Sequence, residues 1–517
     1  AGRSRLSRTN FWTLLPHGGC HDSGLLGNGD GVLACLGDRD DARGGSHSGA
    51  DCWLHREVPT RSAVRVYAQC AWGAGLRETL TGWGRYPKHE TELREWPRHD
   101  NASFPSSASG VIARGNGRAY GDSAIGASTT LDMRKRDRFL SFDPVLGQLV
   151  AEAGVLLADV IRTFLPQGWF PRVTPGTKFV TLGGMIAADV HGKNHHGEGG
   201  MGRCVDWIDL LDDSGSARRC SPDSSPELFW WTIGGMGLTG IILRAAIRLR
   251  PVQTGWIRQN LQPAPNLEAA MVAFEAADES TYSVAWIDCL ARGKNLGRSL
   301  IMRGEHADTA ELTEKAESDR FAMARRRSLH VPVTPPGWLL NGVTVRMFNA
   351  FYYQRGKRER GDALVGWDQY FYPLDAVLGW NRIYGRRGFV QHQCVLPPAS
   401  AARGLRVMLE TISEARIGSF LAVLKKLGPG EGSFAFPMAG YTLALDFPMR
   451  RRTPGLLRAL DRLVIEHGGR LYLAKDASMS ADTMHAMDPR AERFAQWRKD
   501  VGLSGRFQST QSERLSL

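Results

Sequence analysis

The sequence has few cysteines and no long hydrophobic run. Eight cysteines in 517 residues, none of them in a C-x-x-C pair, are too few for a disulfide scaffold. No stretch of 18 apolar residues occurs, which argues against a transmembrane helix. Hydrophobic residues make up 42% and charged residues 23%, so collagen, disordered tails and coiled coils are excluded. We expect a cytoplasmic protein of two to four domains, with at most peripheral contact with the inner membrane.

Basic residues outnumber acidic ones, 65 against 53, which gives a net charge of +12. Such a surplus is typical of proteins that bind nucleic acid, anionic lipid or a phosphorylated ligand. The sequence has no zinc-finger spacing and no RNP-type aromatic run, so we expect no nucleic-acid partner. The basic clusters at 325–327 and 355–360 are interpreted as solvated loops, with a patch facing anionic lipid or a sugar phosphate as the alternative.

The first 77 residues differ in composition from the rest. They contain no Lys and no Met, hold four of the eight cysteines and are rich in Gly and Arg. Their apolar periodicity is poor, and they lack the apolar h-region of a signal peptide. We interpret residues 1–77 as a disordered or non-native extension and leave them unassigned.

From about residue 78 the apolar pattern becomes regular and mixes strands with helices. Strands are predicted at 111–113, in two runs within 139–153, from 241 to about 251, and at 470–475. One helix is predicted over 157–165 from its i, i+3, i+4 spacing, and another from a Thr453 cap to Gly468. The mixture favours an α+β fold, without the βαβ rhythm of a parallel sheet.

Four glycine-rich turns occur between residues 113 and 242. They are ARGNGRAYGDS (113–123), TPGT (174–177), TLGGMIAADVHGKN (181–194) and IGGMGLTGII (233–242). Glycine allows successive backbone N–H groups to point into one concavity, which suits phosphate oxygens. The first turn reads G-x-G-x-x-x-G and opens no obvious helix, so it is not a Rossmann fingerprint. Gly183 and Gly184 precede a predicted short helix, Met185–Val190, whose N-terminus favours an anion. Together the turns predict a dinucleotide held largely by the backbone.

The order of these motifs carries a family resemblance. The patterns R-G-x-G-R-x-Y-G-D, T-P-G-T, G-G-x-I-A-x-D-x-H-G-K-N-H-H and G-G-x-G-L-T-G-I resemble the flavin oxidoreductases of the vanillyl-alcohol-oxidase type. Within that class the sequence is most similar to the family of decaprenylphosphoryl-β-D-ribose 2′-oxidase and its bacterial relatives, from TGWGRYP (81–87) to the C-terminal region. The resemblance implies an FAD-binding domain at 78–252, a substrate domain with a large antiparallel sheet at 253–469, and a segment at 470–517 that completes the FAD domain.

The resemblance also implies the residues that contact FAD. They are Arg114, Gly115, Asn116, Gly117, Arg118, Ala119, Tyr120, Gly121, Asp122, Ser123, Gly176, Thr181, Leu182, Gly183, Gly184, His191, Gly192, Lys193, Asn194, Ile241 and Tyr472. Some relatives attach the flavin covalently through a His after the first glycine pair. Here the stretch 117–120 contains neither His nor Cys, so we expect non-covalent FAD.

Three residues are placed near the reacting atoms by the resemblance: Lys475, His191 and Tyr120. Oxidation of a carbinol needs a C–H bond that faces flavin N5, a group that takes the hydroxyl proton, and positive potential at the reduced flavin. Lys475 follows an apolar run, where burial lowers the pKa of a lysine; the alternative is a strand-end lysine in solvent. His191 and His195 form an i, i+4 pair, but no Glu stands in the H-E-x-x-H position, so we expect no metal.

The implied substrate residues are Trp286, Gln391, Gln393 and Lys425. The two glutamines are spaced i, i+2 on a strand and therefore project from one face, where they meet either sugar hydroxyls or solvent. Lys425 suits a phosphate.

Three positions depart from the ribose oxidase pattern. In GYTLALDF (440–447), Ala444 replaces a Cys and Thr442 replaces an Asn, and Phe371 replaces a pocket Tyr. Hydride chemistry does not need the Cys, so the expected oxidase activity stands while the substrate stays open.

These observations predict an FAD-dependent oxidoreductase acting on CH–OH groups. We expect it to oxidise a secondary hydroxyl of a polyprenyl-phosphate-linked or otherwise activated sugar to a ketone, in cell-envelope glycan biosynthesis. An NAD(P)H-dependent short-chain reductase that reduces the keto product is the expected partner. The alternatives are an aldonolactone oxidase of the D-arabinono-1,4-lactone type, a sugar-alcohol oxidase, and a non-catalytic flavin- or glycan-binding protein. The electron acceptor, oxygen or a quinone, and the oligomeric state are left open.

Overall fold

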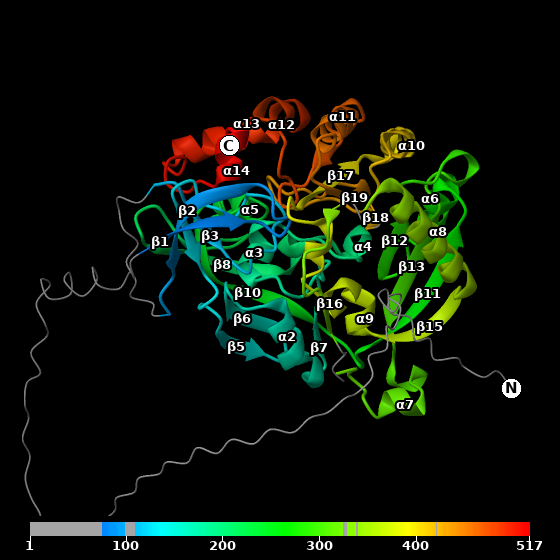
Figure 1. Cartoon of the computed structure of the whole chain (residues 1–517). Coiled ribbons are helices and arrows are strands. Elements are labelled where there is room, and N and C mark those ends of the chain that lie inside the picture. The colour runs from blue at the N-terminus through cyan, green and yellow to red at the C-terminus, as the bar shows by residue number, and fades with distance from the viewer. Residues whose placement is uncertain (1–74, 99–108, 324–327, 338–339, 420) are drawn as a thin grey trace, which may run out of the picture.

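The fold mixes helices with several β-sheets (Figure 1). This computed structural model describes residues 75–98, 109–323, 328–337, 340–419 and 421–517. Residues 1–74 of the predicted extension and the basic cluster at 325–327 lie outside the described residues. Residues 76 and 77 of that extension belong to β1 (Leu76–Thr81). No helix within the described ranges combines the length and apolar character needed to cross a membrane.

The first sheet leads into the first glycine turn. Its order is β1 (Leu76–Thr81), β2 (Lys88–Glu95), β4 (Thr129–Asp132), β3 (Val111–Arg114). Strands β2 and β3 both run parallel to β4, and β1 pairs antiparallel with β2. The predicted strand at 111–113 is confirmed as β3, and the turn that follows Arg114 therefore lies at a sheet edge.

The second sheet carries the other glycine turns at its margins. Its order is β5 (Phe139–Asp143), β6 (Gln148–Glu152), β10 (Ile241–Pro251), β8 (Val205–Leu211), β9 (Ala217–Cys220), and β7 (Trp169–Pro171) pairs with β10. The strands predicted within 139–153 and over 241–251 are confirmed. The predicted amphipathic helix is α2 (Leu157–Phe164), which continues into a 3₁₀ turn, Leu165–Gln167. Its apolar face is buried in the core beside this sheet.

The helix predicted at Met185–Val190 begins three residues earlier, as α3 (Leu182–Ala187). The N–H groups of Leu182 and Gly183 donate to the carbonyls of Val155 and Ala153, and these bonds fix the start of the helix. The glycine pair therefore lies in the first turn of α3 and not before it.

The third sheet has eight strands, and all neighbouring pairs are antiparallel. Its order is β15 (Gly361–Gly366), β11 (Trp256–Ala264), β13 (Ser299–His306), β12 (Tyr282–Ile287), β18 (Ala422–Leu427), β19 (Gly440–Pro448), β17 (Phe389–Leu396), β20 (Arg470–Leu471). Helices α6 (Leu267–Glu275), α10 (Pro398–Ala415) and α11 (Thr453–Glu466) pack on it (Figure 1). This is the large antiparallel sheet expected of the substrate side.

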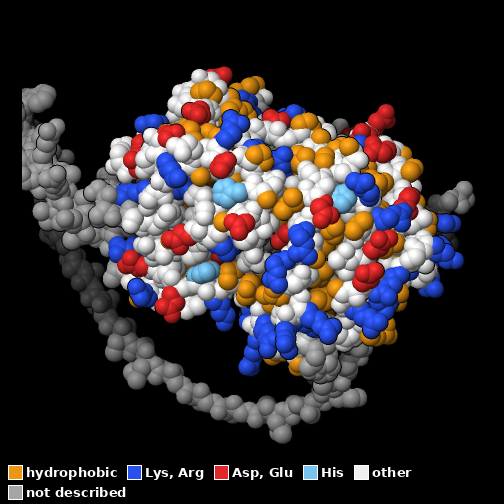
Figure 2. Space-filling model, turned by 90° about the horizontal axis from the view of Figure 1, so that it is seen from above, with side chains coloured by type: hydrophobic (Ala, Val, Ile, Leu, Met, Phe, Trp, Pro, Cys, Tyr) orange, Lys and Arg blue, Asp and Glu red, His pale blue; other side chains and the backbone are white. Residues whose placement is uncertain are grey.

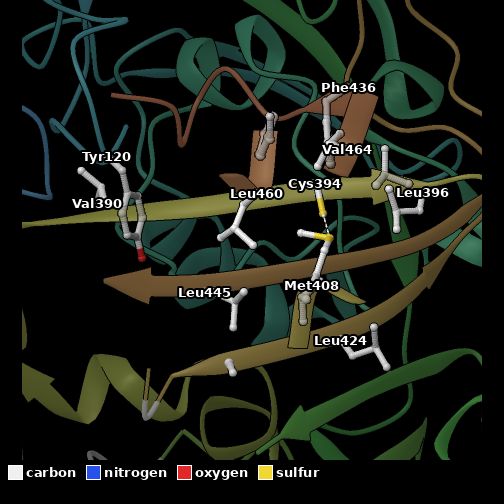
Figure 3. Packing of buried hydrophobic residues seen from close by; sticks show 14 of the residues in the cluster. Tyr120, Val390, Cys394, Leu396, Met408, Leu424, Phe436, Leu445, Leu460 and Val464 are labelled. Atoms are coloured by element: carbon white, nitrogen blue, oxygen red, sulfur yellow. Dashed lines mark hydrogen bonds between the residues drawn. The ribbon is translucent and has the colours of Figure 1, made fainter. Parts of the chain in front are cut away.

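The main core lies between this sheet and its helices. Figure 3 shows Leu424 and Leu445 of the strands together with Leu460 and Val464 of α11. Cys394 of β17 reaches Met408 of α10, with 4.0 Å between the sulfur atoms. Apolar burial of this kind contributes about 25 cal/mol per Å², so this packing stabilises the third sheet.

Further elements complete the chain. They are α4 (His195–Glu198), α5 (Pro226–Thr232), α7 (Glu314–Glu317), β14 (Leu329–His330), α8 (Gly342–Arg358), α9 (Trp367–Phe371), β16 (Val377–Leu378), α12 (Ala481–Met487), α13 (Arg490–Asp500), α14 (Thr510–Leu515), and 3₁₀ turns at Met201–Cys204, Gly293–Asn295, Thr309–Glu311, Pro373–Ala376 and Trp380–Tyr384. The basic cluster at 355–360 is not a loop as predicted, because its first four residues form the last turn of α8.

Two details of the C-terminal region differ from the predictions. Arg452, and not Thr453, caps α11, because the Thr453 hydroxyl accepts from the Arg450 N–H and donates to the Pro448 carbonyl. The strand predicted at 470–475 is reduced to β20. After it the N–H of Lys475 donates to the Tyr472 carbonyl at 2.9 Å, so Lys475 lies in a turn.

The C-terminal segment touches two sheets. Its β20 pairs with β17 at the edge of the third sheet, while its end returns to the first sheet, where the N–H groups of Gly110 and Val111 donate to the carbonyls of Gly505 and Arg506. In Figure 1 the C-terminus lies next to α13 and α14, above β2. The predicted division at residues 252 and 469 stays a prediction.

Candidate active site

A cavity of about 460 Å³ separates the glycine turns from the third sheet. Binding pockets for small molecules and cofactors typically enclose about 300 to 1,000 Å³. Its lining includes residues of all four glycine-rich turns, of seven strands of the third sheet, and of α8. The predicted cofactor turns and the predicted substrate residues therefore face one space.

The first glycine turn presents its backbone to this cavity. Within the described part of the chain, the N–H groups of residues 115–118 donate to no protein acceptor. Gly117 has φ +61°, a conformation that L side chains rarely adopt, and a Cβ at Gly115 would lie 2.1 Å from the Thr181 hydroxyl oxygen. The Arg118 guanidinium lies 4.0 Å from the centroid of the Trp83 ring. Free backbone donors beside a guanidinium form an anion-binding concavity, so the turn fits a diphosphate.

Most of the predicted residues line the cavity. They are Gly115, Asn116, Gly117, Arg118, Ala119, Tyr120, Ser123, Gly176, Thr181, Gly183, Gly184, His191, Gly192, Lys193, Trp286, Gln391, Gln393, Lys425, Tyr472 and Lys475. Arg114, Gly121, Asp122, Leu182, Asn194 and Ile241, predicted to contact FAD, are absent from this lining. The roles of all of them stay predictions.

Residues behind the lining hold it in place. Arg114 donates to the carbonyls of Thr81 and Ala124, at 2.7 and 3.2 Å. The Asp122 carboxylate accepts from Arg514 at 2.7 Å. Asn194 donates to the Arg172 carbonyl at 2.7 Å. Each bond turns a polar group of the motif away from the cavity and toward the protein, so these three residues fix the backbone of the turns.

Lys475 faces an aromatic ring and a buried carboxylate. Its Nζ lies 3.8 Å from the centroid of the Tyr120 ring. Burial lowers the pKa of Lys475, whereas the negative charge of the neighbouring Asp446 acts to raise it. Burial in turn raises the pKa of Asp446. Asp446 is fully buried and accepts hydrogen bonds from Gln391 at 2.5 Å and from Tyr384 at 3.3 Å. A lysine whose pKa is lowered toward neutrality is suited to accept a proton.

His191 is held neutral on the other side of this group. Burial, and then the positive charges of Lys425 and its neighbours, keep the pKa of His191 well below its ordinary value. Its Nε2 lies 2.9 Å from the Gln393 side-chain nitrogen. Within the described residues its Nδ1, which is buried, has no partner. A neutral imidazole with one free nitrogen can make one further hydrogen bond to a ligand.

Three lysines give the cavity a positive potential. Besides Lys475, burial lowers the pKa of Lys193 to about 7 and that of Lys425 to about 8. Lys193 donates to the Tyr370 carbonyl and lies 4.0 Å from the centroid of the Tyr370 ring. Positive groups in a water-poor cavity stabilise negative charge that develops on a bound ligand.

The two glutamines project from one face of β17, as the spacing predicts. Gln391 and Gln393 line the cavity, while His392 points to the opposite side and lies 3.0 Å from the Asp461 carboxylate of α11. Opposite Gln393 on the neighbouring strand is Ala444. Gln391 donates to Asp446, and Gln393 donates to Thr442 at 3.2 Å. The pair therefore belongs to the cavity wall and is not a solvated polar face.

The departing residues and Trp286 also shape the wall. Ala444 and Phe371 line the cavity, and Thr442 reaches it through its hydrogen bond with Gln393. The Trp286 ring packs edge-on against Tyr352 of α8, with 4.8 Å between centroids.

Two carboxylates near the cavity were not assigned a role from the sequence. Asp446 lies in the motif GYTLALDF (440–447), where a lone carboxylate within an apolar strand is an unusual feature. Asp375 lines the cavity and accepts from the Thr177 hydroxyl and the Lys178 N–H, both at 2.8 Å. No local pattern marks Asp375, because its partners lie almost 200 positions earlier in the chain. No cluster of His, Cys, Asp and Glu suited to a metal ion occurs in the described ranges.

Comparison with known proteins agrees with this geometry. Residues 104–221 match the family described as FAD binding domain. The chain is 37% identical over 413 residues to decaprenylphosphoryl-beta-D-ribose oxidase of Mycolicibacterium smegmatis, covering 79% of this chain and 89% of that protein. It is 31% identical to an uncharacterized protein from the mprA 5′ region of Streptomyces coelicolor, over 70% of this chain and all of that protein. Cytokinin dehydrogenase 6 of Oryza sativa is 32% identical over 34% of either chain.

The free N–H groups of residues 115–118 form what we call the diphosphate cradle. This cradle, the cationic cavity and these matches define a flavoprotein. The chain belongs to the FAD-binding oxidoreductases of the vanillyl-alcohol-oxidase type. Within that class it is related to decaprenylphosphoryl-β-D-ribose oxidase.

Proposed function

We propose that this flavoprotein oxidises a secondary hydroxyl of a polyprenyl-phosphate-linked sugar to a ketone. Bound FAD supplies the acceptor for the hydride that leaves the carbinol carbon. The observation that carries the proposal is the position of Lys475, a lysine with a lowered pKa in the same cavity as the diphosphate cradle and the two glutamines. The match with decaprenylphosphoryl-beta-D-ribose oxidase supports the choice of sugar class.

Each wall of the cavity has a role in this reaction. The free N–H groups of the first glycine turn and Arg118 hold the FAD diphosphate without a covalent bond. Gln391 and Gln393 orient the sugar by hydrogen bonds to its hydroxyls. Lys425 pairs with the sugar phosphate, and the reacting hydroxyl lies toward Lys475.

Lys475 takes the hydroxyl proton as the C–H bond breaks. Its neutral form is available near neutral pH because burial disfavours the ammonium. The proton and the hydride together account for the two hydrogens lost by the alcohol. Lys193, and the remaining positive charge around it, then offset the negative charge gained by the cofactor.

Anaerobic bleaching of the flavin tests the proposal. Purified holoprotein is mixed without oxygen with polyprenyl-phosphate pentoses, free pentoses and free aldonolactones, and the absorbance near 450 nm is followed. We expect bleaching by the lipid-linked pentoses. Lys425→Met serves as a probe of phosphate recognition, because it should raise the half-saturating concentration of the phosphate-bearing sugar at least about tenfold and leave free sugars unaffected.

The other outcomes identify the alternatives. Bleaching by aldonolactones and not by lipid-linked pentoses would make the chain an aldonolactone oxidase. A yellow protein that no sugar bleaches would make it a binding protein. Acid precipitation should release FAD into the supernatant; a yellow pellet would contradict the non-covalent attachment.

A further inference from the structure

Helix α8 exposes a row of apolar side chains. Val343, Met347 and Phe351 are 65%, 69% and 51% exposed. Their spacing of four residues places them on one side of the helix. Large hydrophobic side chains exposed singly are ordinary, whereas a continuous row on one helix marks a surface that contacts something apolar.

The opposite side of α8 is fixed to the protein. Val345, Asn349 and Tyr353 are buried, and each lies two residues, or about 200° of helix rotation, after a member of the exposed row. The Asn349 side chain donates to Asp288 at 2.7 Å, and the Tyr353 hydroxyl donates to the Ala264 carbonyl at 3.2 Å. Because these contacts hold α8 in place, the row cannot turn inward.

Positive charge accompanies the row. Between Gly342 and Arg358 the helix has four basic residues, Arg346, Arg355, Lys357 and Arg358, and no acidic one. Arg346, Lys357 and Arg358 are exposed. Lys and Arg side chains also gather beside hydrophobic ones along one edge of the face in Figure 2. An apolar helix face flanked by Lys and Arg is the pattern of helices that lie in the headgroup region of anionic membranes.

The cavity extends to the same helix. Tyr352, Arg355 and Glu359 contribute to its lining, next to Trp286 and Leu300 of the sheet. Arg355 and Glu359 form an ion pair at 3.0 Å, and their side chains keep 24% and 32% of their exposure. The wall of the cavity therefore continues toward the surface at the last turn of α8.

We infer that α8 docks this protein on a membrane surface of net negative charge. Val343, Met347 and Phe351 enter the region between headgroups and acyl chains, and Arg346, Lys357 and Arg358 contact the headgroups. This orientation places the Arg355–Glu359 end of the cavity next to the lipid. The inference concerns the surface alone and holds whichever substrate the cavity accepts.

A second copy of the chain fits the row less well. Each of the three side chains has a surface area of at most about 200 Å², and part of that area is already covered. Together they offer far less area than the roughly 800 Å² that each partner buries in a standard protein interface. A shared positive charge around the row also repels an identical copy. A lipid surface needs only a shallow apolar insertion together with opposite charge.

Vesicle cosedimentation with the full-length holoprotein tests the inference. The protein is mixed with vesicles of phosphatidylglycerol and phosphatidylcholine in equal parts, or of phosphatidylcholine alone. We expect binding to the anionic vesicles that weakens with added salt. Met347→Asp/Phe351→Asp should weaken it at least about tenfold, since it removes apolar insertion and adds repulsion. Val272→Asp is the matched control, because Val272 is 68% exposed on α6, which packs on the sheet elsewhere; its binding should stay unchanged.

Each remaining outcome counts against the inference. Wild-type protein that ignores anionic vesicles, or an aspartate pair that binds as the wild type does, overturns it. A dimer in sedimentation velocity that the aspartate pair dissociates would assign the row to a second copy. If the aspartate pair loses its flavin or its helical circular dichroism, Lys357→Glu/Arg358→Glu replaces it; these side chains are exposed, and unchanged vesicle binding at low salt would again refute the membrane surface.

Discussion

Substitution of two charged neighbours of Lys475, Asp446 and Lys425, should shift the pH dependence of flavin reduction in opposite directions. If neutral Lys475 takes the hydroxyl proton, the rate constant of anaerobic reduction at saturating substrate rises with pH through the pKa of Lys475. The Asp446 carboxylate favours the ammonium and raises this pKa, whereas the Lys425 ammonium lowers it. Asp446→Asn should therefore shift the rise to lower pH, and Lys425→Met should shift it to higher pH.

The size of the pH shift depends on the protonation state of Asp446. A neighbouring opposite charge typically changes a pKa by about 1 to 3 units. Burial raises the pKa of Asp446 itself, so it carries its full charge for only part of the pH range. We therefore expect shifts near the lower end, about one pH unit, which corresponds to about 1.4 kcal/mol.

Stopped-flow absorbance near 450 nm measures the rate constants between pH 5.5 and 9, with the flavin content of each variant as a control for folding. Lys475→Met should show no rise and should be at least about tenfold slower at its best pH, a barrier increase of about 1.4 kcal/mol. Shifts of the two neighbour variants in the same direction, or an undiminished rate in Lys475→Met, would refute Lys475 as the base.

Two further variants test the cradle and the C-terminal anchor. Gly117→Val should yield apoprotein, because its side chain would meet the Arg114 guanidinium in a left-handed backbone. Gly293→Val carries the same backbone strain at φ +56° with nothing within 4 Å, and should keep its flavin; equal flavin content in both would contradict the cradle. Arg498→Met should lower the free energy of unfolding by at least about 3 kcal/mol, because Arg498 is fully buried and donates to four backbone carbonyls. Exposed Arg493→Met on the same helix is its control in urea denaturation, and an equal midpoint in both variants would show that the buried bonds contribute nothing.

The elements that could be predicted from the sequence are those with local causes. Strands β3 and β10 and helix α2 carry their own apolar pattern, and the glycine turns carry their own backbone requirement. The start of α3 differs from the prediction because it depends on bonds to Val155 and Ala153, which lie in the turn after β6 and outside the pattern of 182–187. Likewise Thr453 looks like a cap, but its hydroxyl is already engaged by the Pro448 carbonyl.

The candidate site shows the same limit. The resemblance placed Lys475, His191 and the glutamine pair at the site, and all four line one cavity, while their roles stay predictions. The electrostatic partner of Lys475 was not found, since Asp446 reaches this group only because β19 pairs with β17 and aligns it with Gln391. The outward row of α8 was also not found, because the sheet decides which side of that helix is covered.

The charges around the cavity couple the binding of an anionic ligand to the uptake of protons by the lysines. Burial lowers the pKa of Lys193, Lys425 and Lys475, and the positive charge of Lys425 lowers the pKa of the other two further. An anionic group that enters this part of the cavity favours the ammonium forms and so raises these pKa values. Binding of such a group is then accompanied by proton uptake and weakens as pH rises through the pKa values of the lysines. In the proposed reaction the sugar phosphate lies beside Lys425 and the carbinol beside Lys475. The phosphate therefore favours the ammonium form of Lys425 most, because the effect of a charge falls with distance, and Lys475 is the lysine whose neutral form the reaction requires.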